Sequence, residues 1–254
     1  MPAKSSAQTV ERAIAILNLF REDHVSLGIT SIARQTGLNL TTAHRLVRTL
    51  VREHFMEQDP ANEQYRLGPA LAVLGRRAVE GSGLDRARPT ADRLSAATGE
   101  SVSVGVRASR GVMVVLQSSS RHALRFEHPA GAAIDLHASA MGTGLLAFGE
   151  AAPRSAIGEL GRLPRFTSST ITTRAALLAE LEQVRLDGFA TNHEERYEGV
   201  CGVAAPVLDN VGVARFAVGI QGPSVRLTDE RLLELGPVLV RTAHEVAEHV
   251  LAGS

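Results

Sequence analysis

The side chains best suited to chemistry lie in residues 40–52, where hydroxyl, imidazole and guanidinium groups recur at helical spacing. An α-helix over this segment would gather them on one arc and the apolar side chains on the other. Hydroxyls and guanidinium groups donate hydrogen bonds to phosphate oxygens and to base edges, so the polar arc predicts contact with a nucleic acid. The polar arc holds Thr41, Thr42, His44, Arg45, Arg48, Thr49 and Arg52, and the apolar arc holds Ala43, Leu46, Val47, Leu50 and Val51.

Positive charge is concentrated in the same region. From His24 to Arg52 there is no Asp or Glu. The same segment contains four positive charges, at Arg34, Arg45, Arg48 and Arg52. The whole chain balances 27 Lys and Arg against 27 Asp and Glu. This balance argues against a general polyanion binder and confines any DNA contact to one face. The alternative interpretation is an ordinary amphipathic helix with a solvated basic surface.

The neighbouring helices predict a helix-turn-helix that would position this arc. Residues 30–52 divide into two helices at Gly37, and the second helix is the one that reaches base edges in this motif. Ahead of them, Thr9 is expected to cap a helix that runs to about Arg21 and carries one apolar stripe. This first helix would support the other two.

A small hairpin is predicted after the third helix. Strands at 55–58 and 64–67 are joined by the turn 59–62, which contains Asp, Pro and Asn. Three helices followed by a hairpin make a winged helix-turn-helix. The tip of the wing carries Asp59 and Glu63, so a plain connecting hairpin and a minor-groove contact both remain open.

A linker helix and a second domain are expected beyond the wing. Residues 69–79 are apolar and helical, and the glycines and serine of 80–83 indicate a flexible joint. The predicted domains are therefore a DNA-binding domain at 1–68, a linker at 69–83 and a larger domain at 84–254.

The larger domain has a mixed pattern that predicts an α+β fold. Strands in two clusters, with helices between and around them, indicate one antiparallel sheet with helices packed to a side. The expected strands are 101–107, 112–118, 124–128, 189–193, 200–208 and 213–221, and the expected helices are 85–98, one from about Met141, 153–160, 173–186 and 229–251.

Several functional classes find no support in the sequence. The single Cys201 excludes an internal disulfide, and with no membrane span or signal segment it indicates a cytoplasmic protein. No nucleophile elbow, phosphate loop or C-x-x-C pair occurs, so neither an enzyme nor a cofactor is expected. The histidines in 244–249 fit neither zinc register, and 193–195 is interpreted as a polar loop edge. No catalytic or metal site is predicted.

The chain resembles the IclR-type bacterial transcription regulators. The similarity covers nearly its whole length and rests on several motifs in order. It implies a winged-helix domain, a linker helix and a GAF-like effector-binding domain, in homodimers that commonly pair into tetramers and release or bind a DNA operator when a small organic acid binds. The motifs are TVERAIAILNLF, IARQTGLNLTTAHRLVRTL, YRLG, TGESVSVGV, LHASAMGTGLLA, VRLDGFATNHEE, EGVCGVAAPV and RLTDERL.

The resemblance also implies which residues bind. The DNA-contacting positions match Thr41, Thr42, His44, Arg45 and Arg48. The backbone N–H groups of Ala140 and Met141 match an anion cradle at a helix N-terminus, which suits a carboxylate. The remaining effector positions match Asn192, Gly202, Gly219 and Gln221. Two glycines in place of larger residues leave room, which favours an aromatic or longer-chain carboxylate. Cys201 is expected on the opposite face of its strand.

The expected function is thus a ligand-responsive transcription regulator, a repressor, that binds a roughly palindromic double-stranded operator and senses a small organic or aromatic acid. Two other classes remain open. One is a small-molecule sensor that acts through protein partners without specific DNA binding, against which the intact polar arc argues. The other is an architectural DNA binder, which the sizeable second domain disfavours.

Overall fold

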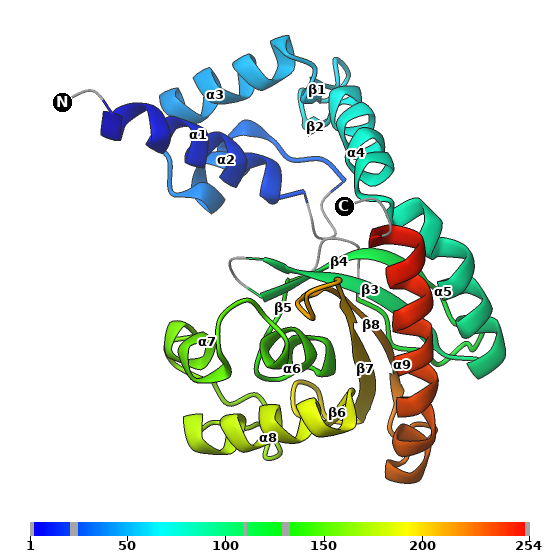
Figure 1. Ribbon diagram of the computed structural model, residues 1–254. Helices are drawn as coiled ribbons and strands as arrows, with labels where there is room; N and C mark the ends of the chain where they lie inside the picture. Colours follow the sequence, from blue (N-terminus) through cyan, green and yellow to red (C-terminus); the bar gives the residue numbers. More distant parts are fainter. Residues whose placement is uncertain (1–2, 21–24, 109–110, 129–132, 252–254) are drawn as a thin grey trace. The chain divides into compact units, whose positions relative to one another are not determined.

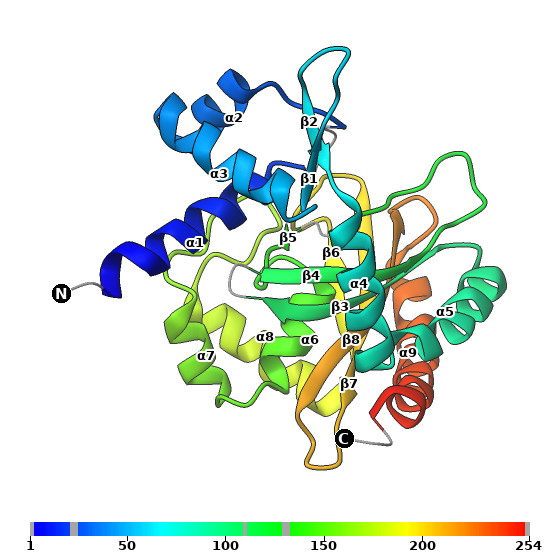
Figure 2. The same cartoon turned by 90° about the horizontal axis from the view of Figure 1, so that it is seen from above.

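The computed structural model describes residues 3–20, 25–108, 111–128 and 133–251. The chain forms two compact units, Met1–Gly81 and Ser82–Ser254, called here the N-terminal and C-terminal units. Figure 1 shows the helices and strands of each unit, and Figure 2 gives a second view. No helix among the described residues is long and apolar enough to cross a membrane.

The N-terminal unit is a three-helix bundle with a two-stranded hairpin. Its core consists of side chains from the three bundled helices and both hairpin strands, including Ile16, Ile32, Val47, Met56 and Tyr65. The predicted helix-turn-helix and hairpin are therefore confirmed. The elements are α1 (Ala3–Asn18), α2 (Ile29–Thr36), α3 (Leu40–Arg52), β1 (Met56–Gln58), β2 (Tyr65–Leu67) and α4 (Pro69–Ser82).

The turn between α2 and α3 follows from two residues. Gly37 has φ +68°, a left-handed conformation that a glycine adopts without strain, and it ends α2. Asn39 then caps α3, because its side-chain oxygen accepts a hydrogen bond of 2.8 Å from the amide of Thr42. Together they fix where α3 begins.

Two predicted boundaries in this unit are wrong. Helix α1 begins at Ala3 rather than at Thr9, because residues 3–8 include no Gly or Pro that would interrupt a helix. It ends at Asn18, and the predicted end at Arg21 lies outside the described residues. Helix α4 continues through the expected joint to Ser82, and an ion pair of 3.3 Å between Arg76 and Glu80 spans its last turns.

The C-terminal unit is built on a six-stranded antiparallel sheet. The strand order is β5-β4-β3-β8-β7-β6. The strands are β3 (Ser101–Ala108), β4 (Gly111–Ser118), β5 (Ala133–Ile134), β6 (Ala190–His193), β7 (Val200–Leu208) and β8 (Ala214–Pro223). The prediction of a strand at 124–128 is wrong. Phe126 and His128 pack their rings against Tyr197 instead of joining the ladder, and β5 forms the edge.

Helices cover both faces of this sheet, not one side as expected (Figures 1 and 2). The alternation of strand residues explains this arrangement: in β7, Cys201 and Val203 join one core cluster, whereas Ala204 joins the other. The first cluster packs on α5 (Leu84–Thr98) and α9 (Asp229–Leu251), and the second on α6 (Ala140–Ala147), α7 (Pro153–Glu159) and α8 (Arg174–Asp187).

Candidate functional site

Helix α3 presents a polar surface that the sequence predicted. Thr41, His44, Arg45 and Arg48 are exposed, whereas Ala43, Leu46 and Val47 are buried. Six exposed residues line one shallow surface together with Leu40, and we call them the α3 polar face: Thr41, His44, Arg45, Arg48, Thr49 and Arg52.

Most of the positive charge on the α3 polar face is not paired with an acidic side chain. Arg52 donates to Glu53 over 2.9 Å and forms an ion pair with it. Among the described residues, neither Arg45 nor Arg48 forms an ion pair. Thr42 is only half exposed, whereas Thr41 is exposed, so the Thr41 residue is the more accessible of the two at the start of the helix. The backbone amide of Thr42 donates to the Asn39 side chain. Sequence reasoning missed Leu40, which is 53% exposed although apolar.

The tip of the wing is organised by its own polar side chains. Asp59 accepts from the amide of Ala61 over 2.8 Å, and Asn62 accepts from the amide of Gln64 over 2.9 Å. Glu63 has φ +57°. These bonds close the turn, and the acidic groups repel phosphate, which favours the connecting-hairpin interpretation.

A second candidate site lies at the start of α6. Ser139 caps the helix by accepting from the amide of Gly142 over 3.1 Å, and its carbonyl accepts from Thr143 over 2.9 Å. The amides of Ala140 and Met141 precede these bonds and are left without a helical acceptor. Gly142 is required for packing, because a Cβ there would lie 2.3 Å from the carbonyl oxygen of Leu136.

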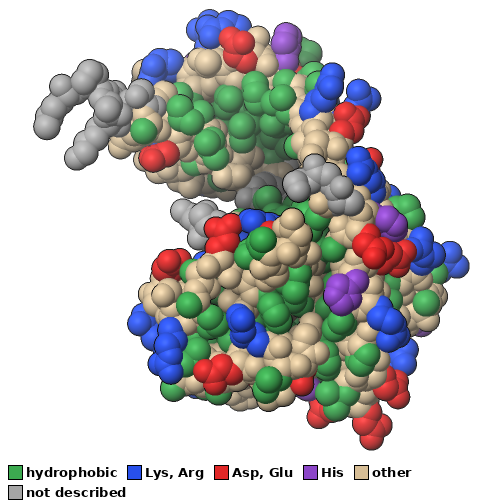
Figure 3. Space-filling view, in the orientation of Figure 1, with side chains coloured by type: hydrophobic (Ala, Val, Ile, Leu, Met, Phe, Trp, Pro, Cys, Tyr) green, Lys and Arg blue, Asp and Glu red, His purple; other side chains and the backbone are tan. Residues whose placement is uncertain are grey.

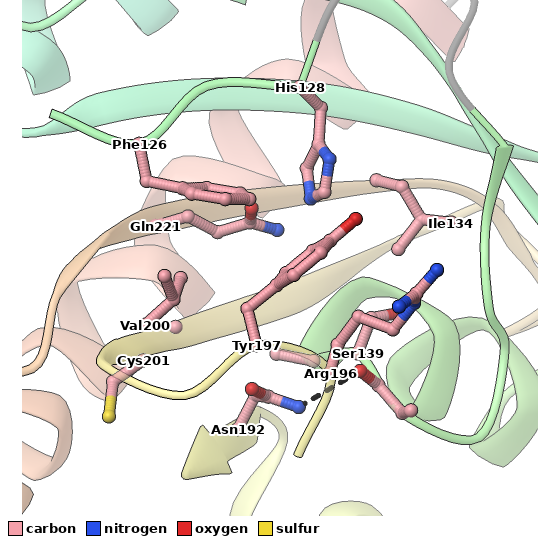
Figure 4. Close-up of a pocket in the computed structure, with 13 residues that line it drawn as sticks. Phe126, His128, Ile134, Ser139, Asn192, Arg196, Tyr197, Val200, Cys201 and Gln221 are labelled. Atoms are coloured by element: carbon pink, nitrogen blue, oxygen red, sulfur yellow. Dashed lines mark hydrogen bonds between the residues drawn. The ribbon is translucent and has the colours of Figure 1, made fainter. Parts of the chain in front are cut away.

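Three of the predicted effector residues form a row across neighbouring strands. Asn192 of β6 pairs with Gly202 of β7, which pairs with Gln221 of β8. All three line a cavity together with Ala140. The Asn192 side chain is buried and donates to the carbonyl of Ala138 over 3.1 Å, so it fastens the segment before α6 (Figure 4).

Gly219 does not line this cavity. A Cβ at that position would lie 3.0 Å from Cγ of Met141, whose side chain is fully buried above the strand. The room predicted at Gly219 is therefore already filled, and the Met141 side chain is part of the core. Met141 can serve a ligand only through its backbone amide.

Aromatic residues that the sequence did not single out form much of the cavity wall. The ring centroids of Phe126 lie 4.9 Å from His128 and 5.2 Å from Tyr197, and all three rings surround the same space in Figure 4. The free space is about 20 Å³, which is room for about one water molecule. No periodic pattern marks these residues, because they lie in segments without regular structure.

Arg196 contributes a positive charge to this wall of the cavity. Nε of Arg196 donates to Oδ2 of Asp135 over 2.8 Å. Its guanidinium carbon lies 3.9 Å from the ring centroid of Phe166 and 4.7 Å from that of Tyr197. Burial first, and then the charge of Arg196, lower the pKa of His128 to about 4. His128 is therefore neutral at pH 7.

The other polar residues near the cavity face elsewhere. The Cys201 sulfur points away from the cavity in Figure 4, as predicted, and burial raises the pKa of its thiol. His193 bonds to Asp229 and Thr191, at 2.9 and 3.0 Å. Within the part of the chain that the structure describes, no group of three or more His, Cys, Asp or Glu side chains could hold a metal.

Comparison with known proteins adds to this geometry. The family descriptions "IclR helix-turn-helix domain" and "Bacterial transcriptional regulator IclR C-terminal" match residues 9–60 and 83–248. The HTH-type transcriptional regulator BhcR of Paracoccus denitrificans is 32% identical over 94% of this chain and 86% of its own.

Solved structures share the fold. An IclR transcriptional regulator from Alicyclobacillus acidocaldarius is 25% identical, with a TM-score of 0.85 over 96% of this chain and 98% of that one. An IclR homologue from Microbacterium hydrocarbonoxydans, crystallised with 4-hydroxybenzoate, is 23% identical, with a TM-score of 0.80 over 96% and 99%.

Proposed function

The chain belongs to the IclR family of bacterial transcription regulators and is a DNA-binding regulator that senses a small molecule, and on this basis we propose which residues do each task. Residues 1–68 bind DNA, residues 69–83 link the two units, and residues 84–254 bind the effector and take part in oligomerisation, together with exposed apolar side chains of α1 and α4. The relatives are transcription regulators rather than enzymes, and the protein acts in the cytoplasm, where bacterial DNA lies.

The α3 polar face supports the DNA assignment. Arg45 and Arg48 are exposed and carry no ion pair among the described residues, so they can bind a guanine edge or a phosphate without first breaking an ion pair. Thr41, Thr42 and His44 supply further donors near the helix start, where recognition helices contact bases. Leu40 adds an apolar group that suits a thymine methyl. The exposed, unpaired arginines on a capped helix are the observation that carries the proposal.

A homodimer, alone or paired into a tetramer, is the proposed assembly. Helix α1 exposes Val10 and Ile14 by 59% and 51%, and α4 exposes Val73 and Leu74 by 60% and 52%. Hydrophobic side chains gather over the helices of the N-terminal unit in Figure 3. Burying these side chains between two copies would place two α3 helices on one operator. Half-sites should then lie about one helical turn, or a multiple of it, apart in a roughly palindromic site.

The cavity beside α6 is the proposed effector site. The amides of Ala140 and Met141, which have no acceptor within the helix, and the positive end of the helix dipole support binding of a carboxylate. Asn192, Gly202 and Gln221 line the same space. Effector binding would act by favouring one arrangement of the linker over another, which it can do only through different affinities for the two. As a repressor, the protein would leave its operator when the acid binds.

Fluorescence anisotropy tests this function. Purified protein is titrated into DNA from immediately upstream of its own gene and into scrambled DNA, at two salt concentrations, with and without a panel of small and aromatic carboxylates. Specific binding that one acid weakens is the expected result. Salt-sensitive binding without sequence preference would favour an architectural binder. No binding to any operator candidate would favour the sensor that acts through protein partners.

A further inference from the structure

The cavity contains one charged side chain that the family resemblance does not assign to the ligand. Arg196 follows β6 and lines the cavity, and the described lining includes no Asp or Glu. His128, the other basic group there, is neutral at pH 7. Asp135, which pairs with Arg196, is not part of the lining. The wall therefore presents a guanidinium group and no carboxylate to the space, which favours an anion over a cation.

The guanidinium group of Arg196 is held in place by its neighbours. Asp135 accepts only from Nε, over 2.8 Å, and the ring of Phe166 lies against the group, with its centroid 3.9 Å from the guanidinium carbon. The side chain is 31% exposed. An arginine that is fixed in this way has lost its conformational freedom before a ligand arrives, which lowers the entropic cost of binding.

Most of its donors are still available. A guanidinium group carries five N–H donors, and within the described residues the hydrogen bonds of Arg196 use one of them. The two terminal nitrogens form a planar fork that matches the two oxygens of a carboxylate. Lysine at this position would offer charge but no fork.

The same cavity contains a second, separate point for an anion. Ala140 lines the cavity at the start of α6, and neither its amide nor that of the adjacent Met141 is used by the Ser139 cap, which accepts from Gly142. Between these two points the wall includes apolar side chains such as Phe126, Ile134 and Val200, and the uncharged amides of Asn192 and Gln221. Two anion-binding points in a cavity with such a wall suit a ligand that has a negative group at each end of a carbon skeleton.

We propose that Arg196 determines effector specificity and that the effector is a dicarboxylate, which binds the α6 amides with one carboxylate and Arg196 with the other. The inference rests on the proposed function of the cavity as the effector site. Free space of about 20 Å³ cannot hold such a molecule, so Tyr197 moves outward on binding. Its ring is at the cavity and the residue is 40% exposed, so it has solvent to move into.

Isothermal titration calorimetry of the full-length protein without DNA tests the inference. The probes are matched pairs: succinate with butyrate, glutarate with valerate, adipate with hexanoate, and terephthalate with benzoate. The unmodified protein is expected to bind at least one dicarboxylate about tenfold to a hundredfold more tightly than its partner, as a charge-assisted pair of bonds allows. Arg196→Gln should abolish that preference and leave monocarboxylate affinity within about threefold.

Three further variants separate ligand binding from a structural role. Arg154→Gln removes an exposed positive charge on α7 that pairs with no acid among the described residues, and it should change nothing. Asp135→Asn keeps Arg196 and should keep the preference, even if the protein melts at a lower temperature. Arg196→Lys keeps the charge without the fork and should retain only part of the preference, and it decides the question should Arg196→Gln not fold.

The possible outcomes distinguish this inference from the proposed function. Equal affinities for both members of every pair, or no binding of any probe, would overturn the dicarboxylate assignment. A dicarboxylate that binds through Arg196 but leaves DNA affinity unchanged would uphold the inference and contradict the regulatory mechanism. If DNA affinity responds to monocarboxylates alone, the regulatory mechanism is upheld and the dicarboxylate inference is contradicted.

Discussion

Replacing Glu195 by Gln should make the protein more stable, and increasingly so as pH rises. Glu195 is 9% exposed, and its Oε2 has no hydrogen-bond partner among the described residues. Burial, followed by the negative charge of Glu180, raises the pKa of this carboxyl to about 7. Ionising it in the folded protein is therefore unfavourable, whereas the unfolded chain ionises it freely near pH 4.5.

The sign and size follow from proton linkage. Below the unfolded pKa the carboxyl is protonated in both states and costs nothing; as pH rises through 4.5 towards 7, the folded state loses stability relative to the unfolded one. The difference between 4.5 and about 7 corresponds to about 3 kcal/mol at pH 8, and to about 1 kcal/mol at pH 5. Gln has nearly the same shape as the protonated acid and no charge. Glu195→Gln should therefore exceed the parent by about those amounts.

Urea unfolding from pH 5 to 8 measures this difference. The chain has no Trp and two Tyr. In a Tyr65→Phe background, Tyr197, two residues after Glu195, is the sole tyrosine, and its fluorescence reports on unfolding of the C-terminal unit. Glu198→Gln, which removes an exposed acid from the same loop, is the control and should show little change. A Glu195→Gln effect that is flat with pH, or destabilising at pH 8, would refute the reasoning.

Three further predictions concern the two sites. Arg45→Ala should weaken specific operator binding by about 1–3 kcal/mol if it reads a base, whereas Arg48→Ala should weaken all sequences evenly and reduce the salt slope if it binds phosphate; anisotropy that detects no loss in either variant contradicts the assigned face. Asn192→Ala should change the effector response in that assay and spare effector-free DNA affinity, and loss of both would assign it a folding role. Gly142→Ala should destabilise the protein by about 1–3 kcal/mol in urea, because the new Cβ meets the Leu136 carbonyl; an unchanged midpoint would mean that this loop can withdraw freely.

Sequence predicted the elements best where periodicity and end signals coincide. The start and end of α9 at Asp229 and Leu251 came out as expected. So did the end of α5 at Thr98, which Gly99 caps in the left-handed conformation. Glycine in the left-handed conformation marks such ends with a physical requirement. The failures lie where such a signal was weak. Gly81 and Ser82 indicated a joint, but a helix tolerates both residues, and α4 continues through them.

The candidate sites divide in the same way. The α3 polar face could be predicted, because one helix carries it and helical spacing decides which side chains share a face. Asn192, Gly202 and Gln221 could be placed only by resemblance, since their alignment depends on the pairing of three strands. Phe126 and Arg196 were missed because they lie in irregular segments. Their positions depend on ring contacts and on Asp135, distant in the sequence.

The cavity has walls of two different kinds. Asn192, Gly202 and Gln221 belong to paired strands, whereas Phe126, His128 and Arg196 belong to loops outside the sheet. A loop can be displaced without breaking a ladder of backbone hydrogen bonds, whereas a strand paired with its neighbour cannot. The part of the wall formed by strands is thus stiff, and the part formed by loops is compliant. Over evolutionary time, such loops could accumulate substitutions and admit differently shaped molecules, while the sheet beneath them kept the same architecture.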